Sequence, residues 1–462
     1  IIMVLRQKRE NTDVLIIDAS KGFIKEGKNN KLRASDIKRI ADTFIKRESI
    51  PKFSRVVSRE EIRSNDYNLN IPRYVDSSEA AEHWDVYASM FGGIPTAEID
   101  EMSEFWTAFP ALKKALFTES GIPYVNVSTP DIKSAIKSHP DVVGFENAFN
   151  AAFSTFPAFL KEELIDRMGS IEISKAETVL SADIFDRLKE IPLIDKYAAF
   201  QLLDDDWTGI SIDLEMLQTE GFAATKKVDP NLVIKKKDGK DQEVQEGWVG
   251  HIIPFDLVQA TLLSTETDEL HGLESRLAEI PSEYESILDE MTEEDKESCN
   301  DVLTEEGDAF VPKEVSKKIK ELKKDRSPES VALRTLLEKV ESLVKSEKEI
   351  KAEIKAKSAA LQAKTKDTIE SLSDEQALDL LEKKWIAPLI ESIHKLPDTV
   401  IDSLVSQIQA LQNKYATTFF EVEQQISETE ATLSGMIDDL EGNEYDMLGL
   451  NELKKLLGGS AE

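Results

Sequence analysis

The sequence has a single cysteine, Cys299, and no long apolar run. One thiol cannot form an intramolecular disulfide, which excludes a disulfide-stapled scaffold and predicts a reducing compartment, the cytoplasm. No stretch approaches the ~18 consecutive apolar residues of a membrane-spanning helix, so no membrane partner is expected. The opening apolar residues 1–5 are too few for the core of a secretory signal peptide, and no basic residue precedes them.

Several motifs that carry chemistry are also lacking. The sequence has no G-x-x-x-x-G-K-[ST] phosphate loop, no H-E-x-x-H pair and no paired cysteines. Its five histidines never fall within four residues of one another. The acidic runs at 204–206 and 293–295 are typical of solvated helix faces rather than of a metal site. We therefore predict no catalytic, cofactor-binding or metal-binding residue in this chain.

Basic residues are scarce and unevenly spread. The chain has 57 Lys and Arg against 89 Asp and Glu, a net charge of -32. Residues 1–75 hold 17 basic and 10 acidic residues, a net of +7, which leaves 40 minus 79, or -39, for residues 76–462. A basic segment on an acidic protein is typical of one face that meets nucleic acid. Ordinary variation in composition is the alternative, because no aromatic residues interleave with these cations.

The pattern of apolar residues predicts a mainly α fold. Residues 1–6 and 13–18 read as a β-hairpin that extends a larger sheet, because an isolated hairpin is marginal in water. A helix is expected over 35–46, with Ser35 as its N-cap. The expected domains are a β-hairpin and helix segment over 1–75, a helical domain over 76–207, a small β insertion over 208–256, an acidic helical or linker region over 257–330, and coiled-coil helices with a terminal helix over 331–462.

Two apolar stripes at heptad-compatible spacing predict a C-terminal antiparallel coiled coil. The first stripe consists of Leu336, Val340, Leu343, Ile350, Ile354 and Leu361, and it is interrupted by Glu347, Lys357 and Lys364. The second consists of Leu404, Ile408, Leu411, Tyr415, Phe419, Val422, Ile426, Leu433, Met436 and Leu440, with a one-residue phase slip between Tyr415 and Phe419. A short leucine-rich helix capped by Gly458 follows.

An ordered series of segments resembles the modification (M) subunits of type I restriction-modification systems. The segments are 2–6 (IMVLR), 13–20 (DVLIIDAS), 54–58 (SRVVS), 66–74 (DYNLNIPRY), 92–95 (GGIP), 98–100 (EID), 105–106 (FW), 110–112 (PAL), 196–200 (KYAAF) before Trp207, and 449–459 (GLNELKKLLGG). The resemblance spans essentially the whole chain, and it implies the C-terminal portion of such a subunit. Residues 1–75 would then be the C-terminal remnant of its Rossmann-like methyltransferase domain, the terminal helix would bind a partner, and double-stranded DNA would be another partner.

By this resemblance, the parent subunit transfers a methyl group from S-adenosylmethionine to adenine N6. The resemblance also implies assembly with a specificity (S) subunit, a second M subunit and a restriction (R) subunit. The family's glycine-rich cofactor turn and its Asn/Asp-Pro-Pro-aromatic tetrad are not in this sequence. Residues 91–93 (FGG) lack a preceding apolar strand, and residues 229–232 (DPNL) end in the wrong residues, so no catalytic role is carried over.

Two sets of candidate contacts follow from the residues and the resemblance. The candidate DNA contacts are Lys235, Lys236, Lys237 and Lys240, at the tip of the β insertion, together with the N-terminal cations; a solvated loop is the alternative. The candidate partner contacts are Leu404, Ile408, Leu411, Tyr415, Leu450, Leu453, Leu456 and Leu457; intramolecular packing of both stripes is the alternative.

Two functions remain open at this point. The first is a non-catalytic portion of an adenine-specific DNA methyltransferase subunit, which serves assembly and DNA clamping. The second is an independent helical coiled-coil adaptor without a role in methylation. The opening apolar run favours the first, because an adaptor has no use for an orphan strand. A split gene, in which another chain supplies the cofactor half, is a third possibility.

Overall fold

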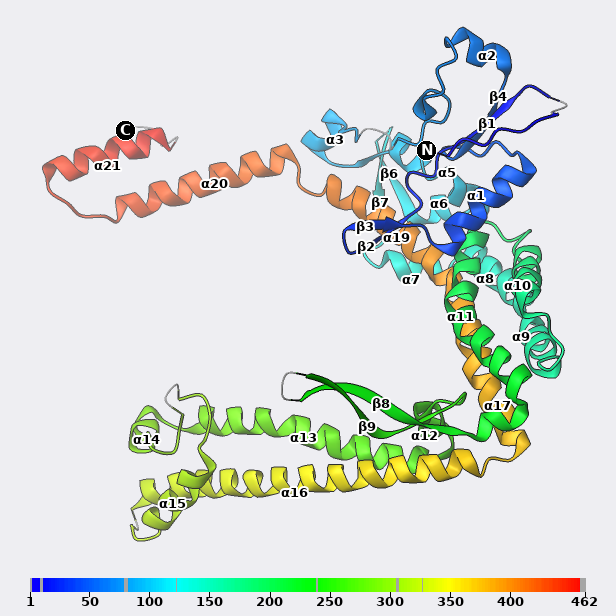
Figure 1. Cartoon of the computed structure of the whole chain (residues 1–462). Helices are drawn as coiled ribbons and strands as arrows, with labels where there is room; N and C mark the ends of the chain where they lie inside the picture. Colours follow the sequence, from blue (N-terminus) through cyan, green and yellow to red (C-terminus); the bar gives the residue numbers. More distant parts are fainter. Residues whose placement is uncertain are drawn as a thin grey trace. The chain divides into compact units, whose positions relative to one another are not determined.

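The computed structural model is mostly helical, with small antiparallel sheets (Figure 1). It describes residues 2–8, 11–78, 82–121, 123–237, 240–304, 307–325 and 327–457. The chain forms two compact units, each assembled from separate parts of the sequence. Unit 1 comprises residues 1–160, 172–209 and 388–462, and unit 2 comprises residues 161–171 and 210–387.

Unit 1 begins with short strands and continues with helices. Its first elements are β1 (Val14–Ile17), β2 (Ile24–Glu26), β3 (Asn29–Lys31), α1 (Ala34–Lys46), β4 (Ser54–Val57), α2 (Arg59–Ser64) and the 3-10 turn η1 (Ile71–Arg73). Next come α3 (Val86–Phe91), β5 (Ile94–Pro95), α4 (Thr96–Asp100), α5 (Ser103–Ala108), α6 (Leu112–Leu116), β6 (Phe117–Gly121), β7 (Tyr124–Val127), α7 (Ile132–Lys137), α8 (Pro140–Phe153), α9 (Phe156–Leu160) and α10 (Ile173–Arg187). The unit closes with α18 (Ala387–His394), α19 (Leu396–Lys414), α20 (Phe419–Asp438) and α21 (Glu444–Leu456), and α11 (Lys196–Glu220) contributes to both units.

The expected N-terminal hairpin is wrong for the described residues. Residues 2–6 form no strand, and β1 pairs instead with β4, antiparallel, with Val14 opposite Val57 and Ile17 opposite Ser54. The physical reason is that Ile16 and Val57 are buried together with Ile62 in a small apolar cluster. Pairing of β1 with residues 2–6 would not provide these contacts. The helix expected over 35–46 is present as α1. Its N-cap is Arg33 rather than Ser35, because Asp36 accepts from the Arg33 backbone N–H.

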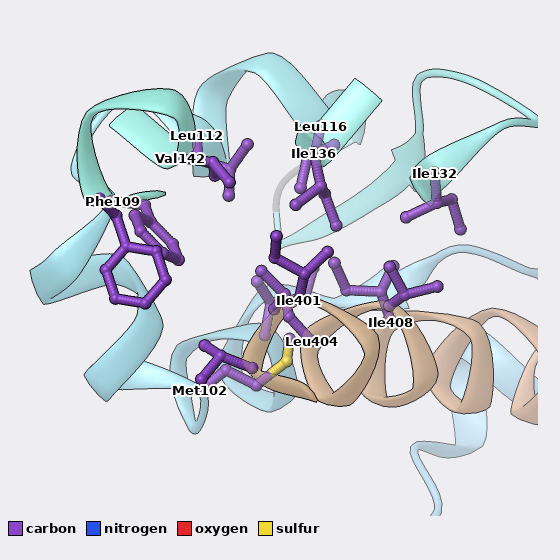
Figure 2. Close-up of a cluster of buried hydrophobic side chains, with 14 of the residues drawn as sticks. Met102, Phe109, Leu112, Leu116, Ile132, Ile136, Val142, Ile401, Leu404 and Ile408 are labelled. Atoms are coloured by element: carbon purple, nitrogen blue, oxygen red, sulfur yellow. The ribbon is translucent and has the colours of Figure 1, made fainter. Parts of the chain in front are cut away.

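The main core of unit 1 packs α19 against helices from the first third of the chain (Figure 2). Figure 2 shows Ile401, Leu404 and Ile408 of α19 facing Leu116, Ile132 and Ile136. The three-stranded sheet β5-β7-β6 borders this cluster, and its antiparallel pairs were not expected from the helical periodicity of this region. Phe109 and Phe145 stack edge-to-face within the same core, with ring centroids 5.6 Å apart.

Unit 2 contains a β-hairpin and several long helices. Its elements are the π-helical turn η2 (Lys161–Asp166), the 3-10 turn η3 (Phe222–Lys226), β8 (Val228–Lys237), β9 (Lys240–Gly250), α12 (Phe255–Leu262), α13 (Ser264–Glu290), α14 (Glu293–Ser298), α15 (Pro312–Leu322), α16 (Pro328–Glu370) and α17 (Asp374–Trp385). The expected insertion is therefore a hairpin over 228–250. Residues 210–220, which were expected to belong to it, complete helix α11 instead.

The long helix α16 pairs with α13, not with the second apolar stripe as expected. The two helices lie side by side in Figure 1. They are antiparallel, because positions late in α16 pair with positions early in α13. Lys364 pairs with Glu266, Lys357 Nζ lies 2.8 Å from Glu269, and Tyr284 donates to Glu347 over 3.2 Å. The three residues that interrupt the apolar stripe of α16 thus each contact α13.

The acidic region 257–330 is part of this packed helical pair rather than a linker. One core joins Ile287, Met291 and Cys299 to Leu333, Leu337 and Val340, so it draws on both sides of the boundary expected at residue 330. The acidic residues of α13 lie on its solvent-facing side, or pair with lysines of α16 as Glu266 and Glu269 do. Among the described residues, no helix combines the length and the hydropathy needed to cross a bilayer.

Candidate functional site

The second apolar stripe is divided between two helices. α19 ends at Lys414 with Tyr415 as its C-cap, and α20 begins at Phe419 with Thr418 as its N-cap. The Thr418 hydroxyl accepts from the Glu421 N–H, and the Glu421 carboxylate accepts from the Thr418 N–H, a capping box that defines a new helix start. The phase slip in the sequence is therefore a helix break.

A polar network holds the end of α19 in place. Lys414 Nζ lies 2.8 Å from Glu98 Oε2, and both side chains are nearly buried. Tyr415 also donates to Glu98, and Lys414 lies over the ring of Trp84 at 5.3 Å from its centroid. Burial, the largest single influence, lowers the pKa of Lys414, but the hydrogen bond to Glu98, the charge of Glu98 and the neighbouring Tyr415 together outweigh it and raise the pKa. This network fixes the point from which α20 leaves the core.

An apolar cavity of about 520 Å³ lies between α3 and the start of α20. Its lining includes Trp84, Met90, Phe419 and Val422. Gly92, next to α3, has φ +86°, and a Cβ there would meet the Thr418 methyl group at 3.3 Å. A larger residue at position 92 would therefore be strained and would crowd the N-cap of α20.

Along α20, an apolar stripe lies on the surface. We call it the α20 seam: Phe419, Val422, Ile426, Leu433 and Met436 of the helix, with Leu440 two residues past its end, all of which are exposed. Their spacing of three and four residues is that of a coiled-coil heptad, with Thr429 at the one polar position. Phe419 is 65% exposed and Met436 is 61% exposed. An amphipathic helix in water normally buries such a stripe, so the α20 seam is a candidate interaction surface.

The charges beside the α20 seam are of one sign. Helix α20 carries Glu421, Glu423, Glu428, Glu430 and Asp438 and has no Lys or Arg. Two such helices brought together would place carboxylates against carboxylates, which disfavours self-pairing. The surface is complementary to an amphipathic helix with basic residues beside its apolar stripe.

The terminal helix α21 folds back onto α20. Lys454 Nζ lies 2.7 Å from Asp438, and Leu450 and Leu457 are half-buried, whereas Leu453 and Leu456 are exposed. Gly442 allows the turn, because a Cβ at this position would meet Asp446 Cβ at 2.9 Å. The expected cap Gly458 lies outside the described residues.

Four of the predicted partner contacts have a different role in the structure. Leu404 and Ile408 are fully buried, Tyr415 is buried, and Leu411 packs against the main core of unit 1. Intramolecular packing occupies these side chains, so they are removed from the candidate interface. Leu450, Leu453, Leu456 and Leu457 stay in it as predictions.

The predicted DNA contacts lie at the end of the β8–β9 hairpin. By strand register, Lys235 is opposite Gln242, Lys236 is opposite Asp241 and Lys237 is opposite Lys240. Lys236 is exposed, and the side chains of the other three lie outside the described residues. Many N-terminal cations are already in ion pairs within the chain; these include Arg33 with Asp36, Lys38 with Asp42, Arg39 with Asp195 and Arg55 with Glu61.

The described residues do not fit a methyl-donor site. Rossmann-like enzymes bind such cofactors at the end of parallel strands, beside a glycine-rich turn. Every strand pair described here is antiparallel. We therefore derive no chemical step through S-adenosylmethionine for this chain.

Comparison with known proteins connects the front of the chain to DNA methylation. Residues 1–83 match the N-6 DNA Methylase family. This chain is 35% identical over 86 residues to the type I restriction enzyme MpnII methylase subunit of Mycoplasma pneumoniae, an alignment that covers 18% of this chain and 16% of that protein. It is 39% identical over 92 residues to the type I restriction enzyme MjaVII methylase subunit of Methanocaldococcus jannaschii, covering 19% of this chain and 16% of that protein.

A second protein of the same organism, the MjaVIII methylase subunit, is 36% identical over 92 residues, again covering 19% and 16%. The chain thus aligns with less than a fifth of the length of these relatives, and no solved structure matches it. The resemblance to type I methylase subunits is confirmed over part of the chain. The α20 seam lies outside residues 1–83, which match the N-6 DNA Methylase family.

Sequence reasoning found the apolar stripe of α20 but not its exposure. It also missed the network of Glu98, Lys414 and Tyr415, because Glu98 is more than 300 residues away from the other two in the sequence. The one available signal was the phase slip after Tyr415, which marks the end of the buried part of the stripe.

Proposed function

We propose that this chain is part of the methylase subunit of a type I restriction-modification enzyme, and that it serves assembly with the specificity subunit. Residues 1–75 would be the end of a Rossmann-like methyltransferase domain. The parent subunit would transfer a methyl group from S-adenosylmethionine to adenine N6. The match of residues 1–83 to N-6 DNA methylases supports this membership.

The observation that carries the assembly role is the α20 seam. The buried heptad positions belong to α19, and the exposed positions begin at the capped start of α20. The apolar stripe therefore passes from the core of unit 1 to its surface at this helix break. Long helices of a specificity subunit with basic flanks would satisfy both the apolar stripe and the acidic residues beside it. Leu453 and Leu456 of α21 would extend the contact. A second M subunit and the R subunit would join the same complex.

Calorimetric titration of the full chain with its specificity subunit tests this role. The double variant Ile426→Gln/Leu433→Gln should weaken binding by tenfold or more, because each buried side chain of this size contributes about 1.5–3 kcal/mol. The control is Ala431→Gln, which introduces the same polar residue at an exposed position on another face of α20. The control should bind like the unmodified chain.

The same titration separates the proposal from an independent adaptor. An adaptor would give no heat with the specificity subunit, whether or not the upstream methyltransferase half is present. Binding that the double variant does not weaken would locate the contact outside the α20 seam and contradict the proposal. The unfolding temperature of the double variant should stay close to that of the unmodified chain, because both side chains are exposed.

DNA clamping is a second part of the proposal, supported by the exposed Lys236 near the end of the β8–β9 hairpin. The affinity of the chain for double-stranded DNA would be measured at several salt concentrations. Replacing Lys235, Lys236, Lys237 and Lys240 with Gln should make the slope of log affinity against log salt concentration less steep, by about 0.9 for each lost phosphate contact. The control replaces Lys323 and Lys324, which are exposed in the same unit, with Gln. An unchanged slope in the tip variant would show that the tip lysines do not contact DNA.

A further inference from the structure

The apolar cavity between α3 and the start of α20, which we call the α3–α20 pocket, has walls of large side chains that water reaches (Figure 1). Trp84 is 57% exposed and Val86 is 74% exposed on one wall, and the exposed Phe419 lies on the other. None of the residues that line the pocket is charged. Soluble proteins seldom leave so many large apolar side chains together in water, so the pocket indicates a site that a partner fills.

Both walls of the pocket are fixed before anything binds. Asp85, the N-cap of α3, accepts from the Ala88 N–H over 2.8 Å and from the Tyr124 hydroxyl over 3.1 Å. Its backbone N–H donates to the Tyr415 hydroxyl over 3.1 Å, and the rings of Trp84 and Tyr415 meet edge-to-face with centroids 6.0 Å apart. The capping box of α20 holds the opposite wall. Such a site loses little conformational entropy when it is filled.

The α3–α20 pocket is continuous with the α20 seam. Phe419 and Val422 line the pocket, and they are also the first two residues of the seam. A helix that lies along the seam would therefore reach the pocket at one end. The pocket has a volume of about 520 Å³. This is within the range of about 300–1,000 Å³ that is usual for pockets that enclose a ligand. Binding energy concentrates where a bulky side chain enters a pocket of this kind.

We propose that the α3–α20 pocket holds a bulky aromatic side chain of the specificity-subunit helix that lies on the α20 seam. The identity of the partner rests on the proposed function, whereas the capacity of the pocket for an aromatic ring does not. Trp84 and Phe419 present rings and Met90 presents a sulfur, and these groups pack favourably against another ring. Because Glu421 and Glu423 follow directly on α20, the aromatic residue of the partner should have Lys or Arg residues beside it.

Other occupants fit the pocket less well. A second copy of this chain would bring its own acidic α20, or the equally acidic surroundings of its pocket, against Glu421 and Glu423. The last residues of the chain, 458–462 (GGSAE), have no side chain large enough to fill the pocket. A basic helix with an aromatic residue satisfies both the apolar walls and the acidic residues beside them.

Calorimetric titration of the full chain with the specificity subunit tests the role of the pocket. Val86→Gln/Met90→Gln places two polar side chains on the wall formed by α3, and it should weaken binding by tenfold or more. Both side chains are exposed in the free chain, so the urea midpoint of this pocket variant should equal that of the unmodified chain. The control is Phe91→Gln, which removes an exposed ring from the same helix but outside the pocket lining. The control should bind like the unmodified chain. Equal binding by the pocket variant and the control would overturn the proposal.

Indole is a probe of the pocket that does not need the partner. In saturation-transfer NMR, the full chain should transfer magnetisation to indole, and addition of the specificity subunit should displace the probe. The pocket variant Val86→Gln/Met90→Gln should lose most of the transfer, and Phe91→Gln should keep it. Transfer that the pocket variant does not reduce would show that the ring binds elsewhere, and it would overturn the proposal.

The seam variant separates this proposal from the proposed function. Ile426→Gln/Leu433→Gln should weaken binding of the specificity subunit and leave the transfer to indole unchanged, because neither residue lines the pocket. If the seam variant weakens binding of the specificity subunit and the pocket variant does not, the proposed function stands and the aromatic anchor is overturned. If the unmodified chain does not bind the specificity subunit, the proposed function fails, and the assignment of the occupant fails with it.

Discussion

At the scale of single residues, the carboxylate of Asp213 is buried in unit 2 and depends on hydrogen-bond partners within the chain. It accepts from Trp385 Nε1 over 2.7 Å and pairs with Lys384, which also donates to the Ile252 carbonyl. Asp213 is 6% exposed, so water cannot replace it. The sequence offered no sign of this pairing, because Asp213 and Lys384 are 171 residues apart.

Asp213→Ala should lower the free energy of unfolding by about 3 kcal/mol, because it leaves a lysine and an indole N–H without their acceptor. Urea unfolding measures this change. The matched control is Asp379→Ala, which removes an exposed ion pair with Lys383 on the same helix as Lys384 and should cost under about 0.5 kcal/mol. Equal losses of unfolding free energy in both variants would contradict the expectation that the buried contacts of Asp213 stabilise the chain more than the exposed ion pair does.

His251 should make the stability of unit 2 depend on pH. Its ring nitrogens lie 2.6 Å from Asp229 and 3.2 Å from Glu220, and these bonds raise the pKa of His251 above its ordinary 6.5. A raised pKa means that the stabilisation is complete below about pH 6.5 and is lost as the pH rises through the folded-state value. The pKa of Glu220 is lowered from 4.5, mainly by Lys227 and then by His251, so its contribution is lost in acid.

The difference in urea midpoint between the unmodified chain and His251→Gln should therefore be largest between about pH 4.5 and 6.5, and it should shrink above that range. A pH series of unfolding curves measures this. His271→Gln is the control, because no side-chain contact of His271 is found in the described part of the chain. A difference that is constant from pH 5 to 8 would mean that His251 is not charged in the folded state.

At the scale of elements, the pair α13–α16 explains residues that looked like defects in the sequence. Glu347, Lys357 and Lys364 interrupt an apolar stripe, and each contacts a residue of α13. Burial and the neighbouring Glu347 raise the pKa of Tyr284 to about 12. These polar contacts fix which residues of the two helices are opposite each other, a role that interrupting polar residues have in coiled coils.

Lys357→Glu should lower the urea midpoint, because it places a carboxylate beside Glu269. The double variant Lys357→Glu/Glu269→Lys should recover most of the loss, and the recovery should weaken in high salt. A midpoint for the double variant no higher than that of the single variant would contradict the observed pairing. Lys345→Glu, at an exposed position of α16, controls for the change in net charge.

Single helices and hairpins could be predicted from the sequence, but which of these elements pair with one another could be predicted only in part. The helix over 35–46 and the hairpin around 235–240 follow from periodicity and turn residues, which act over a few positions. The pairing of β1 with β4, and of α13 with α16, depends on contacts between residues far apart in sequence. The apolar residues of α20 were recognised as part of a stripe. Periodicity cannot tell which stripes the rest of the chain covers.

At the scale of the whole molecule, each unit has its own core and is built from discontinuous parts of the chain. Leu404→Ala in unit 1 and Leu337→Ala in unit 2 should each lower the stability of its own unit by about 3 kcal/mol, because both leucines are fully buried. Hydrogen exchange should show faster exchange around residues 109–145 for Leu404→Ala, and around 287–340 for Leu337→Ala. If either variant accelerated exchange equally in both units, the units would not be separate folding units.

The break between α19 and α20 has a consequence for how such a protein can change over generations. The core positions end at Tyr415, and the surface positions begin at Phe419 behind their own N-cap. Substitutions at the exposed positions of α20 should therefore cost little in the folding of unit 1. Divergence of residues 419–440 would alter the choice of partner while the rest of the chain keeps its fold, so related chains should vary most in this segment and least in α19.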